Sequence, residues 1–169
     1  MNITFVPMND AYAQEIIDQW HYEGQYSVYD YVHETDWIQN KEVWGSGLFA
    51  ALGQDGELIG ELSIQFFDPS EVAFDPQDIS PEAKVLWIGF GLKPDLTGKG
   101  YGPGFVRSCA EFAVERHRYQ GSNIGLGVYA FNQRAIKAYQ KAGFAVYHSL
   151  RSELLGKEVD AFYMKKCIK

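Results

Sequence analysis

The sequence has few cysteines, no long apolar run and no excess of basic residues, and each absence excludes a class of protein. Only Cys109 and Cys167 occur, without a CxxC pair, so we expect neither a disulfide framework nor a structural zinc site. No apolar run approaches the roughly 18 residues of a membrane-spanning helix. The first residues lack the basic and apolar regions of a signal peptide. We therefore expect a cytoplasmic protein with no membrane partner.

The charge balance argues against nucleic acid as a partner. Lys and Arg total 15, Asp and Glu total 22, and the net charge is -7, whereas nucleic-acid binders show a basic excess. An acidic surface fits a cationic partner instead. His21 and His33 lack the spacing of metal ligands, so no metal is predicted. The 169 residues, 46% of them hydrophobic, suffice for one globular domain spanning residues 1–169.

Strand and helix patterns alternate along the chain, which predicts a mixed α/β fold. Strands are expected at 3–6, 47–52, 57–67, 85–92, 124–129, 145–150 and 159–165, and helices after Asn9 or Asp10, at 103–119 and at 133–142. Asp55-Gly56 predicts a hairpin between the second and third strands. The proline-containing stretch 68–82 is expected to be an ordered excursion between two strands.

A glycine-rich segment, VLWIGFGLKPDLTGKGYGPGFVRSCAEFA at 85–113, carries the first chemical signal. An apolar strand leads into three glycines and then a helix, an arrangement in which backbone N–H groups and the helix N-terminus can hold a phosphate. The GxxxxGK[ST] pattern is absent, and the loop comes too late for a dinucleotide fold. A nucleotide site and a simple tight turn remain as alternatives.

A second segment, GVYAFNQRAIKAYQKAGF at 127–144, predicts a strand followed by a short helix. Asn132 can cap the helix, and Gly143 can end it in the left-handed conformation. Together the two segments resemble motifs A and B of the GNAT superfamily of acyl-CoA N-acyltransferases. The matching residues are Gly98, Gly100 and Gly102 in the loop, and Asn132, Ala135, Tyr139, Gly143 and Phe144 in the helix.

The resemblance implies a GNAT fold, with a splayed, mostly antiparallel sheet of about seven strands flanked by four helices, and acetyl-CoA as the acyl donor. Thr97 replaces the Gln or Arg of the family pattern, and Pro103 lacks an N–H. The implied contacts to acetyl-CoA come from Phe90, Leu92, Thr97, Gly98, Lys99, Gly100, Tyr101, Gly102, Asn132 and Lys137. Of these, Lys137 and Asn132 also fit an exposed helix face and a helix cap.

The resemblance also makes Tyr139 the candidate general acid that protonates the leaving thiolate. The same tyrosine would pack at the end of its helix. Some family members carry a glutamate on the strand before the loop, where this chain has Leu86. Glu61, on the expected polar face of its strand beside Ser63 and Gln65, is the best acidic substitute as general base, although that position also fits a solvated residue.

Residues 20–36 are rich in tyrosine and acids, and in the family this region forms part of the acceptor wall. Tyr22, Tyr26 and Tyr29 are therefore candidates for binding a cationic amine; packing of this segment onto the core is the alternative. Cys109 fits a core position, so no covalent nucleophile is predicted.

These residues predict an N-acetyltransferase that moves an acetyl group to a primary amine by direct attack in a ternary complex. A small cationic amine is favoured over an amino acid or a protein N-terminus. A GNAT-fold binding or sensor module without turnover is the main alternative. The exposed edge of the last strand pair is compatible with a homodimer.

Overall fold

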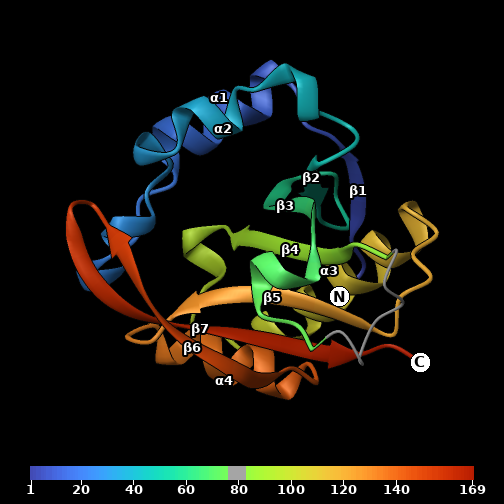
Figure 1. The fold of residues 1–169 in the computed structure, drawn as a ribbon. Coiled ribbons are helices and arrows are strands. Elements are labelled where there is room, and N and C mark those ends of the chain that lie inside the picture. Colours follow the sequence, from blue (N-terminus) through green and yellow to red (C-terminus); the bar gives the residue numbers. More distant parts are fainter. Residues whose placement is uncertain (76–82) are drawn as a thin grey trace. The chain divides into compact units, whose positions relative to one another are not determined.

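The computed structural model describes residues 1–75 and 83–169. Of the predicted excursion at 68–82, residues 76–82 lie outside the described residues. Within the described residues, seven strands form one sheet in the order β1-β2-β3-β4-β5-β7-β6, so the predicted mixed α/β class with seven strands is confirmed (Figure 1). The strands are β1 (Thr4–Pro7), β2 (Leu48–Leu52), β3 (Leu58–Phe67), β4 (Val85–Leu92), β5 (Asn123–Tyr129), β6 (Ala145–Leu154) and β7 (Lys157–Cys167).

Within residues 1–75 and 83–169, four α-helices and several short 3-10 helices connect the strands. The α-helices are α1 (Asp10–Gln19), α2 (Thr35–Ile38), α3 (Gly102–Arg116) and α4 (Gln133–Lys141). The 3-10 helices that bear on the site are η1 (Gly24–Tyr29), η2 (Tyr31–His33), η3 (Lys41–Val43), η4 (Pro69–Val72) and η6 (Pro94–Leu96). Contacts divide the chain into a first unit, Met1–Ser63 with Phe90–Tyr101, and a second unit, Ile64–Gly89 with Gly102–Lys169.

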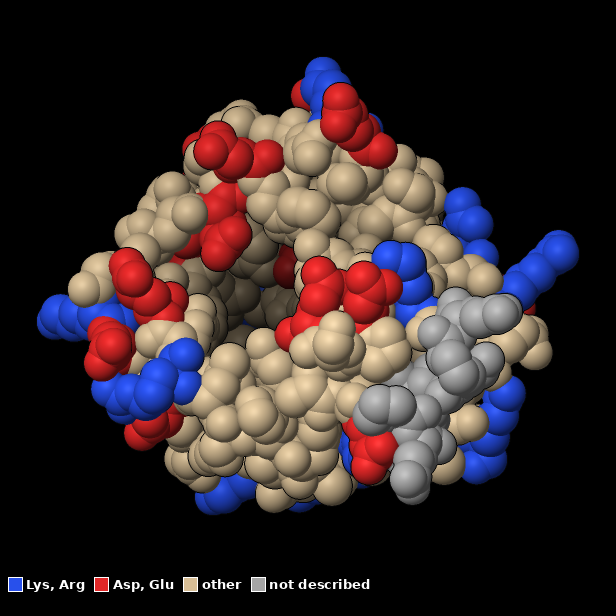
Figure 2. Space-filling model, in the orientation of Figure 1, with Lys and Arg blue, Asp and Glu red and all other residues tan. Residues whose placement is uncertain are grey.

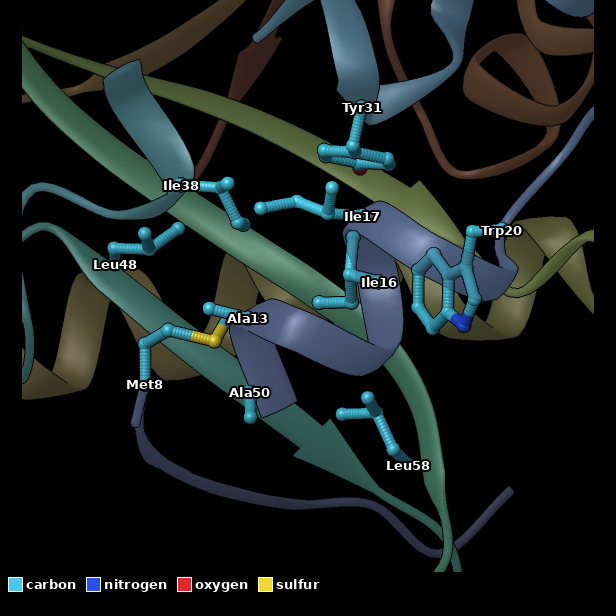
Figure 3. Packing of buried hydrophobic residues seen from close by; sticks show 10 residues of the cluster. All are labelled: Met8, Ala13, Ile16, Ile17, Trp20, Tyr31, Ile38, Leu48, Ala50 and Leu58. Atoms are coloured by element: carbon cyan, nitrogen blue, oxygen red, sulfur yellow. The ribbon is translucent and has the colours of Figure 1, made fainter. Parts of the chain in front are cut away.

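In the first unit, α1 covers a hydrophobic cluster over β1, β2 and the start of β3. Asn9 caps α1 by accepting a hydrogen bond from the Tyr12 N–H at 2.8 Å, as predicted. Its inner side is apolar: Ala13, Ile16, Ile17 and Trp20 recur at helical spacing and are all buried. Figure 3 shows these side chains meeting others from β2 and β3. This cluster holds the start of β3, which carries the candidate base.

The second unit contains the antiparallel strands β5, β7 and β6, and β4 joins them in parallel through Leu86 opposite Ile124. Helix α3 stops at Arg116, earlier than predicted, because Arg118 adopts a left-handed φ of 49°. The last hairpin is longer than predicted at both strands. Its turn, Leu155-Gly156, has positive φ at both residues, a two-residue hairpin geometry that lets the pairing continue to the tip.

Candidate active site

Glu61 in β3 is the buried charged residue of the described chain. It is 5% exposed and lies opposite Ala50 of β2 in the antiparallel register. The expectation that Glu61 shares a solvated polar face with Gln65 is therefore wrong, because β3 is buried on both faces at this point and reaches solvent only nearer its end. A carboxyl group buried in this way needs hydrogen-bond partners or a functional reason to be there.

One oxygen of the Glu61 carboxylate has a partner and the other has none. The Tyr31 hydroxyl donates to Glu61 Oε1 at 2.7 Å, whereas Oε2 is buried without a hydrogen-bond partner. Gly91 of β4 makes room for this pair, since a Cβ there would overlap the Tyr31 hydroxyl and lie 3.4 Å from Glu61 Oε1. The space beside Gly91 is therefore filled by Tyr31.

Burial gives Glu61 the acid–base properties of a base that works near neutrality. Desolvation raises the pKa of Glu61 to about 7, and the negative charge of Glu34 raises it further, while the Tyr31 hydroxyl and the Gly91 N–H lower it. The pKa of Tyr31 itself is raised well above 10, chiefly by burial and then by the Glu61 charge. Tyr31 is therefore a protonated donor wherever the Glu61 carboxyl titrates.

Tyr22 connects the segment after α1 to the end of β4. Its hydroxyl donates to the Leu92 carbonyl at 2.8 Å, and its backbone N–H donates to Asp30 Oδ1 at 2.8 Å. The second Asp30 oxygen lies 3.2 Å from His21 Nδ1. Hydrogen bonds to the Asp18 carbonyl and then to Asp30 raise the pKa of His21. Two predicted site residues, Tyr22 and Leu92, are thus in contact.

Tyr26 and Tyr29, the other two predicted acceptor residues, lie half-buried in η1. The segment around them is acidic: residues 1–40 contain no Lys or Arg, and their acids are Asp10, Glu15, Asp18, Glu23, Asp30, Glu34 and Asp36. Figure 2 shows acidic side chains gathered over the part of the first unit drawn in blue tones in Figure 1. This surface is suited to positively charged molecules.

The glycine loop, residues 98–102, presents backbone rather than side chains. Gly98 and Gly100 have positive φ values of 72° and 87°, and a Cβ at Gly100 would meet nothing within 4 Å. Residues 97–100 form a turn. The loop leads directly into α3, and backbone N–H groups in a glycine-rich loop of this kind can approach an anion.

Neighbouring side chains leave the loop accessible. Lys99 and Tyr101 are exposed. Phe90 is half-buried, in the part of β4 that belongs to the first unit. Thr97, which replaces the family's Gln or Arg, donates its hydroxyl to the Pro94 carbonyl at 2.7 Å. The Thr97 side chain therefore caps the C-terminal end of η6 in this structure.

In the second unit, α4 has the two predicted terminal structures. Asn132 Oδ1 accepts from the Ala135 N–H at 3.2 Å, so the cap is confirmed. The Phe144 N–H donates to the Tyr139 carbonyl at 2.9 Å, and the Gly143 N–H to the Gln140 carbonyl at 3.0 Å. With Gly143 at φ 100°, these bonds form a Schellman motif. Tyr139 is thus half-buried at a rigid helix end, and Lys137 is exposed.

The part of the chain that the structure describes shows neither a metal-binding cluster nor a membrane-spanning helix. The described residues contain no group of three or more His, Cys, Asp or Glu side chains that could hold a metal ion. In the same residues no helix combines the length and apolarity that crossing a bilayer requires. Cys109 is buried in α3 and Cys167 is exposed, both as free thiols.

Tyr31 is the residue that sequence reasoning missed. It belongs to the tyrosine-rich segment, but nothing in its spacing separates it from Tyr26 or Tyr29. The available signal was indirect: Gly91 on an otherwise apolar strand, which leaves space for a side chain from elsewhere. Only the pairing of β3 with β4 shows that this space faces Glu61.

Comparison with known proteins supports the fold. The structure is similar to AAC(6')-Ib in complex with ribostamycin and coenzyme A, with 20% identity, a TM-score of 0.70 and coverage of 99% of this chain and 94% of that chain. It is also similar to a chimera of spermidine N-acetyltransferase SpeG from Vibrio cholerae and hSSAT, with 16% identity, a TM-score of 0.69 and coverage of 99% and 96%. The curated proteins contain no match to the sequence.

The family itself is established at the level of sequence. The model of the Acetyltransferase (GNAT) family matches residues 10–144. This range includes β3 with Glu61, β4, the glycine loop and α4 through Phe144, and it covers well over half of the chain. The chain therefore belongs to the GNAT family of acetyltransferases, and it is an acyl-CoA-dependent transferase.

Proposed function

We propose that this protein transfers the acetyl group of acetyl-CoA to a primary amine of a small, positively charged acceptor, by direct attack in a ternary complex. The observation that carries the proposal is the buried Glu61 carboxylate, which has a pKa of about 7 and one oxygen without a partner. A general base works best when its pKa lies near the operating pH.

Glu61 answers the main chemical difficulty of the reaction. An alkyl ammonium has a pKa of about 10, and it must lose a proton before its nitrogen can attack a thioester. In the proposed step, Glu61 Oε2 takes that proton, and the neutral nitrogen forms a bond to the carbonyl carbon. The carbon–sulfur bond then breaks, and the thiolate leaves with the electron pair. The acylated nitrogen loses its extra proton to give the neutral amide, and this proton balances the one that the sulfur takes up. Protonation of the sulfur completes the release of coenzyme A.

The donor side of the reaction is assigned from the family resemblance together with the loop geometry. The N–H groups of the glycine loop, residues 98–102, would hold the pyrophosphate, and the backbone of Phe90 would hydrogen-bond the pantetheine arm. The Leu92 carbonyl already accepts from Tyr22, so Leu92 would contribute through its N–H. Asn132 and Lys137 are the proposed contacts on α4. Tyr139 is the proposed acid that protonates the thiolate.

The acceptor class is proposed from charge. Residues 1–40 contain seven Asp and Glu residues and no Lys or Arg; two of these acids pair with Lys41 and Lys93. Tyr22, Tyr26 and Tyr29 lie in the same segment. Carboxylates beside aromatic rings favour a molecule with more than one ammonium group. Amino acids and protein N-termini are the competing acceptors, because each provides an amine without several positive charges.

A paired-acceptor assay tests this class. A diaminoalkane and the amino alcohol of the same chain length differ only in the second ammonium group, and coenzyme A release is followed with a thiol reagent. We expect kcat/KM to favour the diamine, and the preference to shrink at high salt because exposed charges are screened. Equal values for the two compounds, or a preference for amino acids or peptides, would contradict the proposed acceptor.

The alternative of a sensor module that binds acetyl-CoA without turnover makes a different prediction. Thermal melting with acetyl-CoA, coenzyme A, ATP and NAD first identifies the ligand, since a ligand that binds the folded state raises Tm. We expect the two coenzyme A species alone to stabilise the protein. Tyr139→Phe should then slow turnover and leave this shift in Tm unchanged. A wild-type protein that is stabilised by acetyl-CoA but acetylates no amine would favour the sensor.

A further inference from the structure

The Tyr31 side chain is held rigidly at the edge of the first unit's hydrophobic cluster. It is 9% exposed and packs with Trp20 in an edge-on arrangement, with ring centroids 6.0 Å apart. Figure 3 shows its ring beside Ile17 of α1, on the η2 segment that follows the helix. Because the ring is packed in this cluster, movement of the hydroxyl with the Glu61 carboxylate is restricted.

The fixed hydroxyl makes the two carboxylate oxygens unequal. Oε1 accepts the 2.7 Å hydrogen bond from Tyr31, and Oε2 is buried with no partner. Gly91 keeps this arrangement, because any side chain at that position would overlap the Tyr31 hydroxyl. A buried polar atom without a hydrogen-bond partner is rare in proteins. Here Oε2 is that atom, and Oε1 of the same carboxylate has a partner.

On the basis of the proposed function, we propose that Tyr31 is a positioning residue. Its hydroxyl anchors Oε1 so that Oε2 is the oxygen that takes the proton from the acceptor amine. Tyr31 does not itself exchange a proton in this scheme. It sets the orientation of the base, and through the hydrogen bond it favours the ionised carboxylate over the protonated acid.

The surroundings of Glu61 define how its titration should respond to Tyr31. The groups recorded as acting on Glu61 are the Tyr31 hydroxyl from η2, the Glu34 carboxylate that follows η2, and the Gly91 N–H from β4. The facing residue of β2 is the uncharged Ala50. Tyr31 lowers the pKa of Glu61 and Glu34 raises it. Loss of the Tyr31 hydroxyl should therefore raise the pKa of Glu61.

The experiment is a pH profile of kcat/KM for the wild type and Tyr31→Phe, with acetyl-CoA and a diamine. The acid limb of this profile reports the pKa of the free enzyme's base. We expect Tyr31→Phe to move the limb upward by about one pH unit and to lose roughly tenfold in kcat/KM below pH 7. Activity should recover in part at high pH. Tyr12→Phe, a tyrosine packed on the same cluster, is the matched control and should leave the profile unchanged.

A second variant keeps the inference testable if Tyr31→Phe does not fold. Replacing Tyr31 with 3-fluorotyrosine retains the ring and makes the phenol a stronger donor, so the acid limb should move downward. Opposite shifts in the two variants cannot come from a general loss of structure. If the acid limb of the kcat/KM profile lies at the same pH in the wild type and in both variants, the positioning role is overturned.

Glu61→Gln separates this result from a failure of the proposed function. If the wild type transfers acetyl groups and Glu61→Gln abolishes the acid limb, an unmoved limb in the Tyr31 variants refutes Tyr31 alone. If Glu61→Gln keeps the limb and the activity, Glu61 is not the base, and both the proposed mechanism and the role of Tyr31 are refuted.

Discussion

Gly91 in β4 and Gly100 in the glycine loop lie in the same unit, yet the structure uses the absence of a side chain at each for a different purpose. At Gly91 the backbone is extended, and the space beside it is filled by the Tyr31 hydroxyl and Glu61. At Gly100 the space is empty, but φ is 87°, a conformation that other residues adopt only with strain. One glycine provides room, and the other provides a backbone shape.

This difference separates two parts of the proposed reaction. Around Glu61 the function depends on side chains packed out of water, where a single hydrogen bond changes the acidity of the base. In the glycine loop it depends on exposed N–H groups that can approach a phosphate. Substitutions in the first region should change catalysis and its pH dependence, whereas substitutions in the second should change the affinity for acetyl-CoA.

Glu61→Gln should have the largest effect. The amide keeps the shape and still accepts from Tyr31, but it cannot take a proton, so we expect kcat/KM to fall roughly 10²- to 10⁴-fold. The stabilisation of the protein by acetyl-CoA in thermal melting should be unchanged, because Glu61 lies outside the glycine loop. A parallel loss of acetyl-CoA binding would mean that the two regions are not separable.

The same variant predicts a pH-dependent gain in stability. The pKa of Glu61 is raised from 4.5 to about 7 in the folded protein, so the folded state binds the proton more tightly than the unfolded state. Stability is then full below pH 4.5 and falls as the pH rises through 7. At pH 8 Glu61→Gln should be more stable than the wild type by about 3 kcal/mol, and at pH 4 the two should agree, as measured by urea unfolding.

Gly91→Ala should have the next largest effect. The added methyl group would displace the Tyr31 hydroxyl, and a displaced base loses its alignment with the acceptor, which costs roughly 10- to 100-fold in kcat/KM. Gly127→Ala in β5 is the matched control, because its Cβ would lie 3.7 Å or more from its neighbours. An active Gly91→Ala enzyme with an unshifted acid limb would show that the Tyr31–Glu61 contact is dispensable.

Gly100→Ala should act on the donor instead. Alanine at a positive φ carries about 1 to 2 kcal/mol of strain, which corresponds to roughly tenfold weaker binding if the loop relaxes to another shape. Gly56→Ala carries the matching strain, with φ 78° and open space, in the β2–β3 turn. It should lose similar stability and keep its affinity for coenzyme A by calorimetry. Equal losses of affinity in both variants would refute a specific role for the loop.

Most of the fold was predictable because its signals are local. The inner face of α1, the Asn132 cap and the Gly143 helix end each depend on residues within a few positions of one another, and the structure confirms them. The extension of the last hairpin was missed because Leu155-Gly156 is an uncommon turn pair. Strand length there depends on pairing with β7 and not on local apolar alternation.

The burial of Glu61 and its hydrogen bond to Tyr31 could not be predicted from the sequence. The alternation of polar and apolar residues in β3 places Glu61 among polar residues. Glu61 could be chosen as a candidate base because of its residue type alone. Its surroundings include Tyr31 of η2 and Gly91 of β4, which lie far from it in sequence. The hydrogen bond joins residues 30 positions apart. Such long-range contacts leave no periodic pattern in either segment, so neither Tyr31 nor the raised pKa of Glu61 could be predicted.

Glu34→Gln offers the smallest and most specific test of the carboxylate region. Glu34 is exposed, and its negative charge raises the pKa of Glu61, so the variant should lower that pKa and increase kcat/KM on the acid side. Because exposed charges contribute under about 1 kcal/mol, the gain should be at most about fivefold, and it should vanish at high salt. Glu42→Gln makes the same charge change on η3 and should leave the acid limb in place. Since Glu34→Gln and Tyr31→Phe should shift the limb in opposite directions, finding both shifts would assign the limb to Glu61 itself.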